Sequence, residues 1–138
     1  MEFVWEIDMS FLSGLRGMMG GSKPTLSEKW RLPDSTSEIE EILKKDAGIQ
    51  VIYKHSFSCG ISMFAKLKVE EVMKDASDEA EFYLIDVRQS RDASNHVAEL
   101  SGIRHESPQV IVIKNGEIVW HASHGAIDEK SLMKYIEI

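Results

Sequence analysis

The chain contains a single cysteine, Cys59, and the residues around it predict a reactive thiol. Cys59 follows an apolar run and stands at the start of a helical pattern, so its sulfur is expected at a helix N-terminus. Unpaired backbone N–H groups and the positive end of the helix dipole stabilise a thiolate there, and the thiolate is the nucleophilic form. The alternative is a small buried cysteine, which is a common role for this residue. The position at the helix start favours chemistry, and we predict a thiol pKa below that of a free cysteine.

Three polar residues close to Cys59 in the sequence are candidates to assist it. Ser62, three positions later, can donate a hydrogen bond to the thiolate but cannot form a disulfide; the alternative is a solvated helix residue. Lys54 and His55 precede the thiol and could lower its pKa or bind an anionic thiol ligand. Lys54 is explained equally well as an ordinary surface charge.

The composition restricts the partners and the compartment. The chain has 138 residues, 43% of them apolar, and a formal net charge of −7. This size suits one compact domain, and the acidic balance argues against a nucleic-acid binder, which needs a basic face. One cysteine excludes an internal disulfide, and with five scattered histidines it offers no ligand set for a structural metal site. No run of about 20 apolar residues and no signal-peptide pattern occur, so we predict a cytoplasmic protein without stable membrane insertion.

Periodicity predicts the elements that position Cys59. Residues 35–38 have capping chemistry and open a helix that extends to Gly48, and another helix, over about 93–100, stops at Gly102. Asp128 begins a closing helix. In the helix after Cys59, most apolar residues fall on one face: Ile61, Phe64, Ala65, Val69, Val72 and Met73. Strands are expected at residues 49–53, 82–87, 109–114 and 117–122.

The order of these elements predicts the fold class. The first two strands are joined by a helix, which implies a parallel pair with a right-handed crossover. The last two flank Asn115-Gly116, a strong hairpin signal, and must be antiparallel. We therefore expect an α/β protein of thioredoxin-like architecture, with a central mixed sheet of about four strands and helices on both faces. The loop after the first strand then places Cys59 at the carboxyl edge of the sheet, where α/β folds gather ligands.

The first 30 residues differ from the rest of the chain. An apolar stretch at 11–21 is broken by glycines, and a polar connector with one proline follows. Glycine in a helix interior costs about 1 kcal/mol, so a helix here would be weak. We interpret residues 1–30 as a flexible leader or linker and 31–138 as the thioredoxin-like domain; the alternative for the leader is a short membrane-surface or partner-binding helix.

From about residue 30 onward, the chain resembles a known family. The segments Gly102-Ile103-Arg104, Ser107-Pro108 and Lys114-Asn115-Gly116-Glu117 resemble the second half of a thioredoxin. More specifically, four segments resemble the monothiol bacilliredoxin family, also called bacillithiol system protein YtxJ: Lys54-His55-Ser56, Cys59-Gly60-Ile61-Ser62, Ser107-Pro108-Gln109-Val110 and Trp120-His121-Ala122-Ser123-His124-Gly125. The run from Ser107 to Gly125 is the most specific part of the match.

The resemblance implies roles for residues outside the Cys59 segment. It implies that the Ser107–Pro108 peptide bond is cis and faces the sulfur, and that the Ser107 main chain pairs with the backbone of an incoming disulfide. His124 and Gly125 are expected on the same side of the domain as Cys59. The chain departs from the family at Gly60, where members usually carry proline, and this difference bears on how the helix starts and on thiol acidity. We include Gly60 and His55 with these residues as candidate substrate-binding positions.

The resemblance also implies a monothiol redox activity. Dithiol thioredoxins carry a second cysteine where this chain has Ser62, and a buried aspartate where it has Tyr53. Both changes fit a mechanism in which Cys59 accepts a low-molecular-weight thiol from an S-thiolated protein and waits for an external thiol. The implied co-substrate is bacillithiol, with no tightly bound cofactor and no metal.

Two other functions are open at this point. The segment Cys-Gly-Ile-Ser also resembles the Cys-Gly-Phe-Ser signature of monothiol glutaredoxins, which carry iron–sulfur clusters between two subunits. Those proteins have Gly-Thr after the lysine and Gly-Cys-Asp near the end, where this chain has His55-Ser56 and Gly125-Ala126-Ile127. The third possibility is a thioredoxin-like interaction module with an unreactive cysteine, which the thiol pKa would distinguish.

Overall fold

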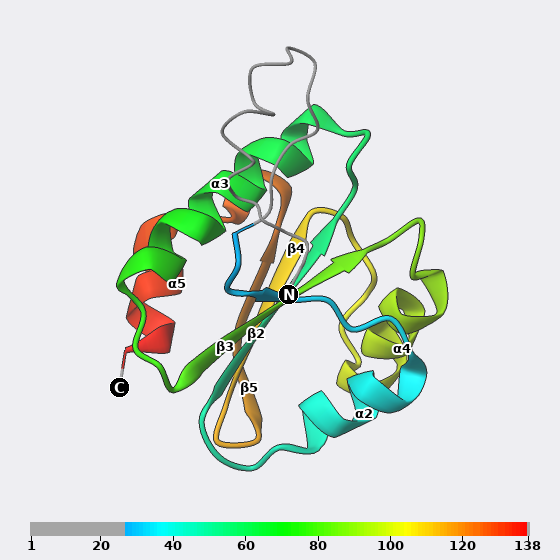
Figure 1. The fold of residues 1–138 in the computed structure, drawn as a ribbon, viewed down its shortest axis with the longest axis horizontal. Helices are drawn as coiled ribbons and strands as arrows, with labels where there is room; N and C mark the ends of the chain where they lie inside the picture. Colours follow the sequence, from blue (N-terminus) through cyan, green and yellow to red (C-terminus); the bar gives the residue numbers. More distant parts are fainter. Residues whose placement is uncertain (1–26, 138) are drawn as a thin grey trace.

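The computed structural model describes residues 27–137, which form a mixed sheet flanked by helices (Figure 1). The leader predicted over 1–30 lies mostly outside the described residues. The sheet has five strands in the order β1-β3-β2-β4-β5. Their bounds are β1 Trp30–Arg31, β2 Ile49–His55, β3 Ala80–Asp86, β4 Gln109–Lys114 and β5 Glu117–Ser123. The predicted thioredoxin-like arrangement is confirmed, with β1 added at one edge to the four expected strands.

The strand directions follow the predicted topology. β2 and β3 are parallel, β4 is antiparallel to β2, and β5 is antiparallel to β4. The short β1 adds to the outer edge of β3 in parallel, through Trp30 opposite Phe82 and Arg31 opposite Tyr83. A two-residue strand has no detectable periodicity, which is why the sequence did not predict it.

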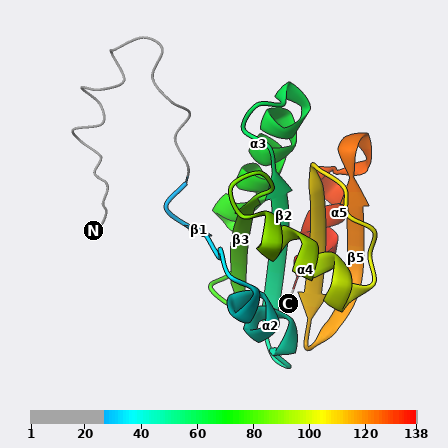
Figure 2. The same cartoon turned by 90° about the vertical axis from the view of Figure 1, so that its right-hand side faces the viewer.

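Helices cover both faces of the sheet, as Figures 1 and 2 show. The helices are α2 Thr36–Lys44, α3 Gly60–Asp75, α4 Arg91–Ser101 and α5 Glu129–Ile136, with a short 3₁₀ turn, η1 His124–Ala126. α3 packs with α5 on one face, and α2 packs with α4 on the other. Within the described residues, no helix combines the length and the apolar character needed to cross a membrane.

Local sequence explains where several elements begin and end. The Ser35 hydroxyl accepts a hydrogen bond from the Glu38 N–H at 3.2 Å and caps α2, as the capping pattern predicted. α4 ends at Gly102, whose φ of 75° gives the left-handed cap. The hairpin turn between β4 and β5 has positive φ at both central residues, Asn115 at 51° and Gly116 at 84°, and Asn-Gly is the preferred pair for such a turn.

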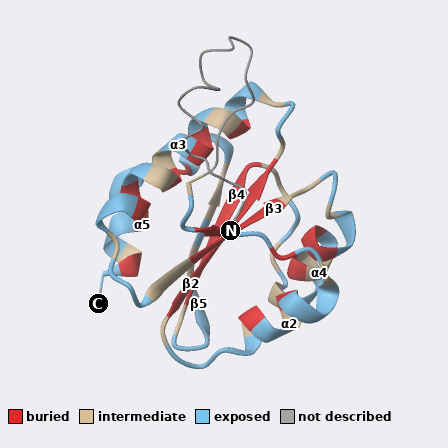
Figure 3. Ribbon diagram, viewed as in Figure 1, coloured by how far each residue is buried: buried red, intermediate tan, exposed pale blue. Residues whose placement is uncertain are grey.

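β2 lies at the centre of the sheet, and all seven of its residues are buried (Figure 3). Successive side chains point to opposite faces. Val51 and Tyr53 belong to the core under α3 and α5, whereas Ile52 belongs to the core under α2 and α4. By the same alternation, the Lys54 and His55 side chains point to opposite faces of the sheet. The two residues therefore have different neighbours.

The apolar residues of α3 do not share one face, and the prediction is wrong for two of them. Ala65, Val69, Val72 and Met73 are buried against the sheet. Ile61 and Phe64 are 58% and 70% exposed. α3 has more apolar residues than one helix face can hold, so periodicity alone could not show which of them the sheet covers.

Candidate functional site

Cys59 forms the N-cap of α3, at the end of the loop that follows β2. Its φ of −115° and ψ of 121° are extended, and the side chain is partly exposed. The backbone N–H groups of Ser62 and then Ile61 point toward the sulfur and lower the pKa of the Cys59 thiol, with a smaller contribution from the Ser62 hydroxyl; burial opposes them. The lowered pKa agrees with the prediction and makes the thiol the candidate nucleophile of the site.

Ser62 is fully buried, so it is not a solvated helix residue. Among the described residues its hydroxyl has no hydrogen-bond partner of ordinary geometry, and it lies close enough to Cys59 only to assist the thiolate weakly. Its carbonyl oxygen accepts a hydrogen bond from the Tyr53 hydroxyl at 2.7 Å. Ser62 thus joins the first turn of α3 to a buried side chain of β2.

Tyr53 occupies the position beneath the thiol where dithiol thioredoxins have a carboxylate. Burial is the largest cause that raises the pKa of Tyr53, so the hydroxyl stays protonated at physiological pH. It has one proton, which it donates to the Ser62 carbonyl. His55 Nδ1, 3.2 Å away, must then be the donor to the tyrosine oxygen, which leaves Nε2 as an acceptor. His55 Nε2 is indeed buried without a partner among residues 27–137.

His55 is a neutral structural group, which corrects the prediction of an anion contact. Its side chain is completely buried, and burial followed by the positive charge of Lys66 lowers the pKa of His55 to about 4. The carboxylates of Asp86 and Glu70 oppose this shift. An uncharged ring with no exposed surface neither stabilises the thiolate by charge nor contacts a ligand in this conformation. It instead holds Tyr53 through the 3.2 Å contact.

Both interpretations of Lys54 are corrected by the structure. The side chain is fully buried, so it is no ordinary surface charge. It points to the α4 face, where its Nζ lies 3.0 Å from His105 Nδ1. Burial lowers the pKa of Lys54 to about 8. Cys59 lies at the start of α3, on the opposite face of the sheet, so Lys54 does not contact the thiol.

A charged pair on α3 with a buried lysine was not predicted. Lys66 Nζ lies 3.1 Å from Glu70 Oε2, and the Trp30 indole N–H donates to the same oxygen at 2.7 Å. Lys66 and Glu70 stand four apart in the sequence, which is the spacing of a helical ion pair, but nothing in the sequence indicates that Lys66 is buried. The pair links α3 to β1 and fixes the helix that carries Cys59 at its start.

The Ser107–Pro108 loop lies at the same end of the sheet as Cys59. The Ser107–Pro108 bond is cis, as predicted. Lys54 pairs with Gln109 across β2 and β4, so Pro108 comes next to the end of β2, from which the Cys59 loop departs. Ser107 Oγ is buried without a partner among the described residues, and the Ser107 main chain has no hydrogen bond within them.

His124 and Gly125 begin the 3₁₀ turn after β5 and lie beside this loop. The His124 N–H donates to the Pro108 carbonyl at 3.0 Å, and His124 Nε2 lies 3.8 Å from Glu106. Lys68 of α3 donates to the Ile127 carbonyl at 3.1 Å, which ties the turn to α3. The expected position on the Cys59 side is therefore consistent with these contacts. A side chain at Gly125 would meet no atom within 4 Å, so the backbone there is open.

Arg88 is a cation near the thiol that the sequence interpretation missed. It follows β3, and its Nη1 lies 3.5 Å from the Ser58 hydroxyl, next to Cys59 in the chain. The available signal was its position directly after a parallel strand, at the carboxyl edge where ligands bind in α/β folds. Because Lys54 and His55 are buried, Arg88 is the better candidate to attract an anionic thiol.

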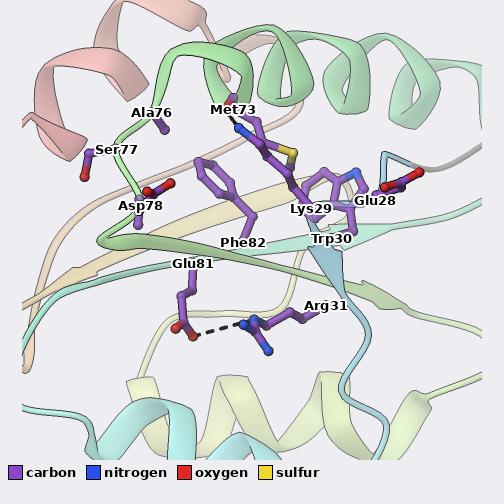
Figure 4. A pocket seen from close by; sticks show the side chains of 11 residues that line it. Glu28, Lys29, Trp30, Arg31, Met73, Ala76, Ser77, Asp78, Glu81 and Phe82 are labelled. Carbon is purple, nitrogen blue, oxygen red and sulfur yellow. Dashed lines mark hydrogen bonds and ion pairs between the residues drawn. The ribbon is translucent and has the colours of Figure 1, made fainter. Parts of the chain in front are cut away.

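A hollow of about 470 Å³ lies at the other end of α3 (Figure 4). It is lined by β1, the start of β3 and the end of α3, including Arg31, Met73 and Phe82. α3 has 16 residues and is therefore about 24 Å long, which separates this hollow from Cys59. The hollow does not belong to the thiol site.

Comparisons with known proteins agree with this geometry. The model of the family Monothiol bacilliredoxin BrxC matches residues 33–132. A solved structure described as a proposed oxidoreductase with a thioredoxin fold is 30% identical, with a TM-score of 0.69, over 78% of this chain and 94% of that one. Fasciola hepatica thioredoxin is 26% identical, with a TM-score of 0.58, over 77% of this chain and 95% of that one. A thioredoxin from Halobacterium salinarum, at 22% identity and a TM-score of 0.60 over 83% and 94%, shows the shared fold.

The family match, the fold and the activated cysteine support a thiol redox role. The single cysteine fits a monothiol centre. The family match covers well over half of the chain and includes Cys59, Pro108 and His124. This chain belongs to the monothiol bacilliredoxin BrxC family.

Proposed function

We propose that this protein is a monothiol thiol–disulfide oxidoreductase that takes a low-molecular-weight thiol, bacillithiol, from S-thiolated proteins onto Cys59. The observation that carries the proposal is the Cys59 sulfur at the N-terminus of α3, with its pKa lowered by the N–H groups of Ser62 and Ile61. The family match adds the thiol class, because its description names a bacilliredoxin.

The reaction proceeds in two exchange steps. The Cys59 thiolate attacks the sulfur of the small thiol in the mixed disulfide, so that a Cys59–thiol disulfide forms and the protein cysteine leaves as a thiolate. Ser62 cannot complete the cycle, because it has no sulfur. An external low-molecular-weight thiol then attacks the small-thiol sulfur and releases Cys59 as a thiolate, with its own proton passing to solvent.

The surrounding residues have supporting roles in this proposal. The Tyr53 hydrogen bond to the Ser62 carbonyl keeps the first turn of α3, and with it both N–H groups, in place beneath the sulfur. The free main chain of Ser107 and the exposed backbone at Gly60 and Gly125 offer contacts for the incoming disulfide. Pro108 and His124 shape that edge through the 3.0 Å bond between them.

Intact-protein mass spectrometry tests the proposal. A bacillithiolated substrate protein is incubated with the reduced protein, and both products are weighed. The bacillithiol mass should move from the substrate to Cys59 and stay there until a free thiol is added. Cys59→Ser should abolish transfer, whereas Ser62→Ala should slow it. An unmodified Cys59 after incubation would refute the proposal, and visible iron–sulfur absorbance after reconstitution with iron and sulfide would support the glutaredoxin-like alternative.

A further inference from the structure

Exposed apolar side chains gather around Cys59. Eight large apolar residues are exposed in the described part of the chain: Leu32, Phe57, Ile61, Phe64, Leu67, Leu100, Ile118 and Met133. Half of these lie in the Cys59 loop or on α3, and we refer to them as the α3 strip: Phe57, Ile61, Phe64 and Leu67. Single exposed apolar residues are normal on a protein surface, but a group beside a reactive site indicates an interaction surface.

The residues of the α3 strip are neighbours along the helix surface. Ile61, Phe64 and Leu67 recur every three residues, so they follow one another along the outer face of α3. Their exposed fractions are 58%, 70% and 55%. Phe57 extends the strip into the loop before Cys59. It is 41% exposed, and its ring and the His55 ring meet edge to face with their centroids 4.3 Å apart.

The part of the strip next to Cys59 also lacks charge, although 28% of the chain is charged. No ionisable residue other than Cys59 occurs between Phe57 and Ala65, and Lys66 is buried in its pair with Glu70. Lys68, directly after Leu67, is partly exposed and donates to the Ile127 carbonyl at 3.1 Å, and exposed charges return on α3 at the Glu71–Lys74 pair, whose atoms lie 3.0 Å apart. The folded core needs none of these exposed side chains, so they remain available to a partner.

We propose that the α3 strip docks an apolar polypeptide segment next to the thiolated cysteine of a protein substrate, and thereby favours protein mixed disulfides over small ones. This inference rests on the proposed function. The exchange itself places the substrate there. In the attack, the three sulfurs lie in line, so the departing cysteine sulfur is about 4 Å from Cys59 Sγ, two disulfide bond lengths away. A polypeptide attached to that sulfur lies within reach of Ile61, which is two residues after Cys59.

The substrate segment binds next to Cys59 and does not alter the exchange reaction. The bonds that form and break are those of the two exchange steps, and the strip supplies only apolar contact area. Burial of Phe64 and Leu67 against the substrate lowers KM for protein substrates, because these contacts form in the bound state whether or not sulfur exchange occurs.

The test compares three bacillithiol mixed disulfides with the full chain. One is a peptide with leucine and phenylalanine flanking its cysteine, the second has serine and glycine instead, and the third is the mixed disulfide of bacillithiol with cysteamine. Phe64→Ser and Leu67→Ser are measured beside Leu100→Ser, a matched control whose side chain is 49% exposed on α4. We expect Phe64→Ser to lower kcat/KM for the apolar peptide about tenfold through KM, the effect of losing part of one phenylalanine's burial. The rates with the polar peptide and with the cysteamine disulfide, and all rates of Leu100→Ser, should stay unchanged.

The other outcomes show which proposal fails, the docking proposal or the proposed function. If the unmodified protein accepts bacillithiol from none of the three, the proposed function fails. If it accepts bacillithiol from all three, and Phe64→Ser changes none of the three rates, only the docking proposal fails. A rise in all three rates in Phe64→Ser would mean that residues 1–26 of this chain cover the strip. A fall in sedimentation mass in Phe64→Ser would mean that a second copy covers it, and either result overturns the proposal.

Discussion

The neutral, buried state of His55 makes the stability of this protein depend on pH. The folded protein holds the His55 pKa at about 4, against 6.5 for an unperturbed histidine. As the pH falls through 6.5, the unfolded chain binds a proton at this ring while the folded chain does not. The folded state therefore loses stability from about pH 6.5 down to about pH 4, and no further loss from His55 occurs below that value.

The size of this loss follows from the two pKa values. Between pH 7 and pH 4.5, the linkage relation gives a loss of about 2 kcal/mol from His55 alone. Lys66, Glu70 and Asp86 all act on His55 and remain in place, so their effect is included in the lowered pKa. Carboxyl groups with lowered pKa, such as that of Glu81, destabilise the fold further in acid, but they do so equally in a variant that differs only at residue 55.

His55→Asn tests this reasoning, because its amide can meet the Tyr53 hydroxyl and does not titrate. Urea unfolding followed by tryptophan fluorescence at several pH values gives the free energy of unfolding of each protein. We expect the free-energy curve of His55→Asn to fall less steeply in acid. The free energy of unfolding of the unmodified protein minus that of His55→Asn should be about 2 kcal/mol larger at pH 7 than at pH 4.5. Parallel curves for the two proteins would refute a buried neutral His55.

His96→Asn provides a control with the opposite sign. Hydrogen bonds to Glu99 and then Glu40 raise the pKa of His96. This group therefore stabilises the fold below pH 6.5 and ceases to do so as the pH rises through its folded pKa. Its removal should cost stability in acid only, and the change should be small because the pairs lie at the surface.

Three further changes have defined outcomes. Lys54→Met should raise the free energy of unfolding at pH 7 by about 1–3 kcal/mol, because it removes a buried amine whose only partner among residues 27–137 is His105. A loss of stability in urea unfolding would contradict this. Gly60→Pro should raise the free energy of unfolding by about 0.4–1 kcal/mol, because residue 60 is the first of α3 and Cys59 before it is extended. A Cβ at residue 60 meets nothing within 4 Å. A lower melting temperature of this variant would contradict the prediction. Arg88→Gln should slow the reaction of Cys59 with an anionic disulfide and weaken the salt dependence of that rate. The rate with cystamine, which is cationic, should not fall. Equal slowing with the anionic disulfide and with cystamine would exclude an electrostatic role of Arg88.

Local signals in the sequence were sufficient to predict most of the fold. Ser35 and Asp128 cap their helices, Gly102 ends one, and Asn115-Gly116 turns the hairpin, because each of these features depends on a few neighbouring residues. The cis bond before Pro108 was predicted through the family resemblance, because no local pattern specifies it.

The environment of the site residues could not be predicted from the sequence. β2 is buried on both faces, so its apolar pattern does not show which side chain lies under α3 and which under α4. Lys54 and His55 are adjacent in the sequence, yet their environments differ, since one contacts His105 and the other contacts Tyr53. Arg88 approaches Ser58 across a sequence separation of 30 residues, which only the packing of β2 beside β3 produces.

A centre with one sulfur has a particular equilibrium behaviour. In a dithiol centre, oxidation consumes one small disulfide and releases two small thiols. The equilibrium ratio of oxidised to reduced centre therefore depends on the square of the thiol concentration. Cys59 has no second sulfur in the chain, and each exchange at this residue swaps one thiol for another. The fraction of Cys59 held as a mixed disulfide then depends on the ratio of disulfide to thiol in the pool and not on the pool's total concentration. Diluting all thiols and disulfides together would shift a dithiol centre toward oxidation but would leave the fraction of Cys59 held as a mixed disulfide unchanged.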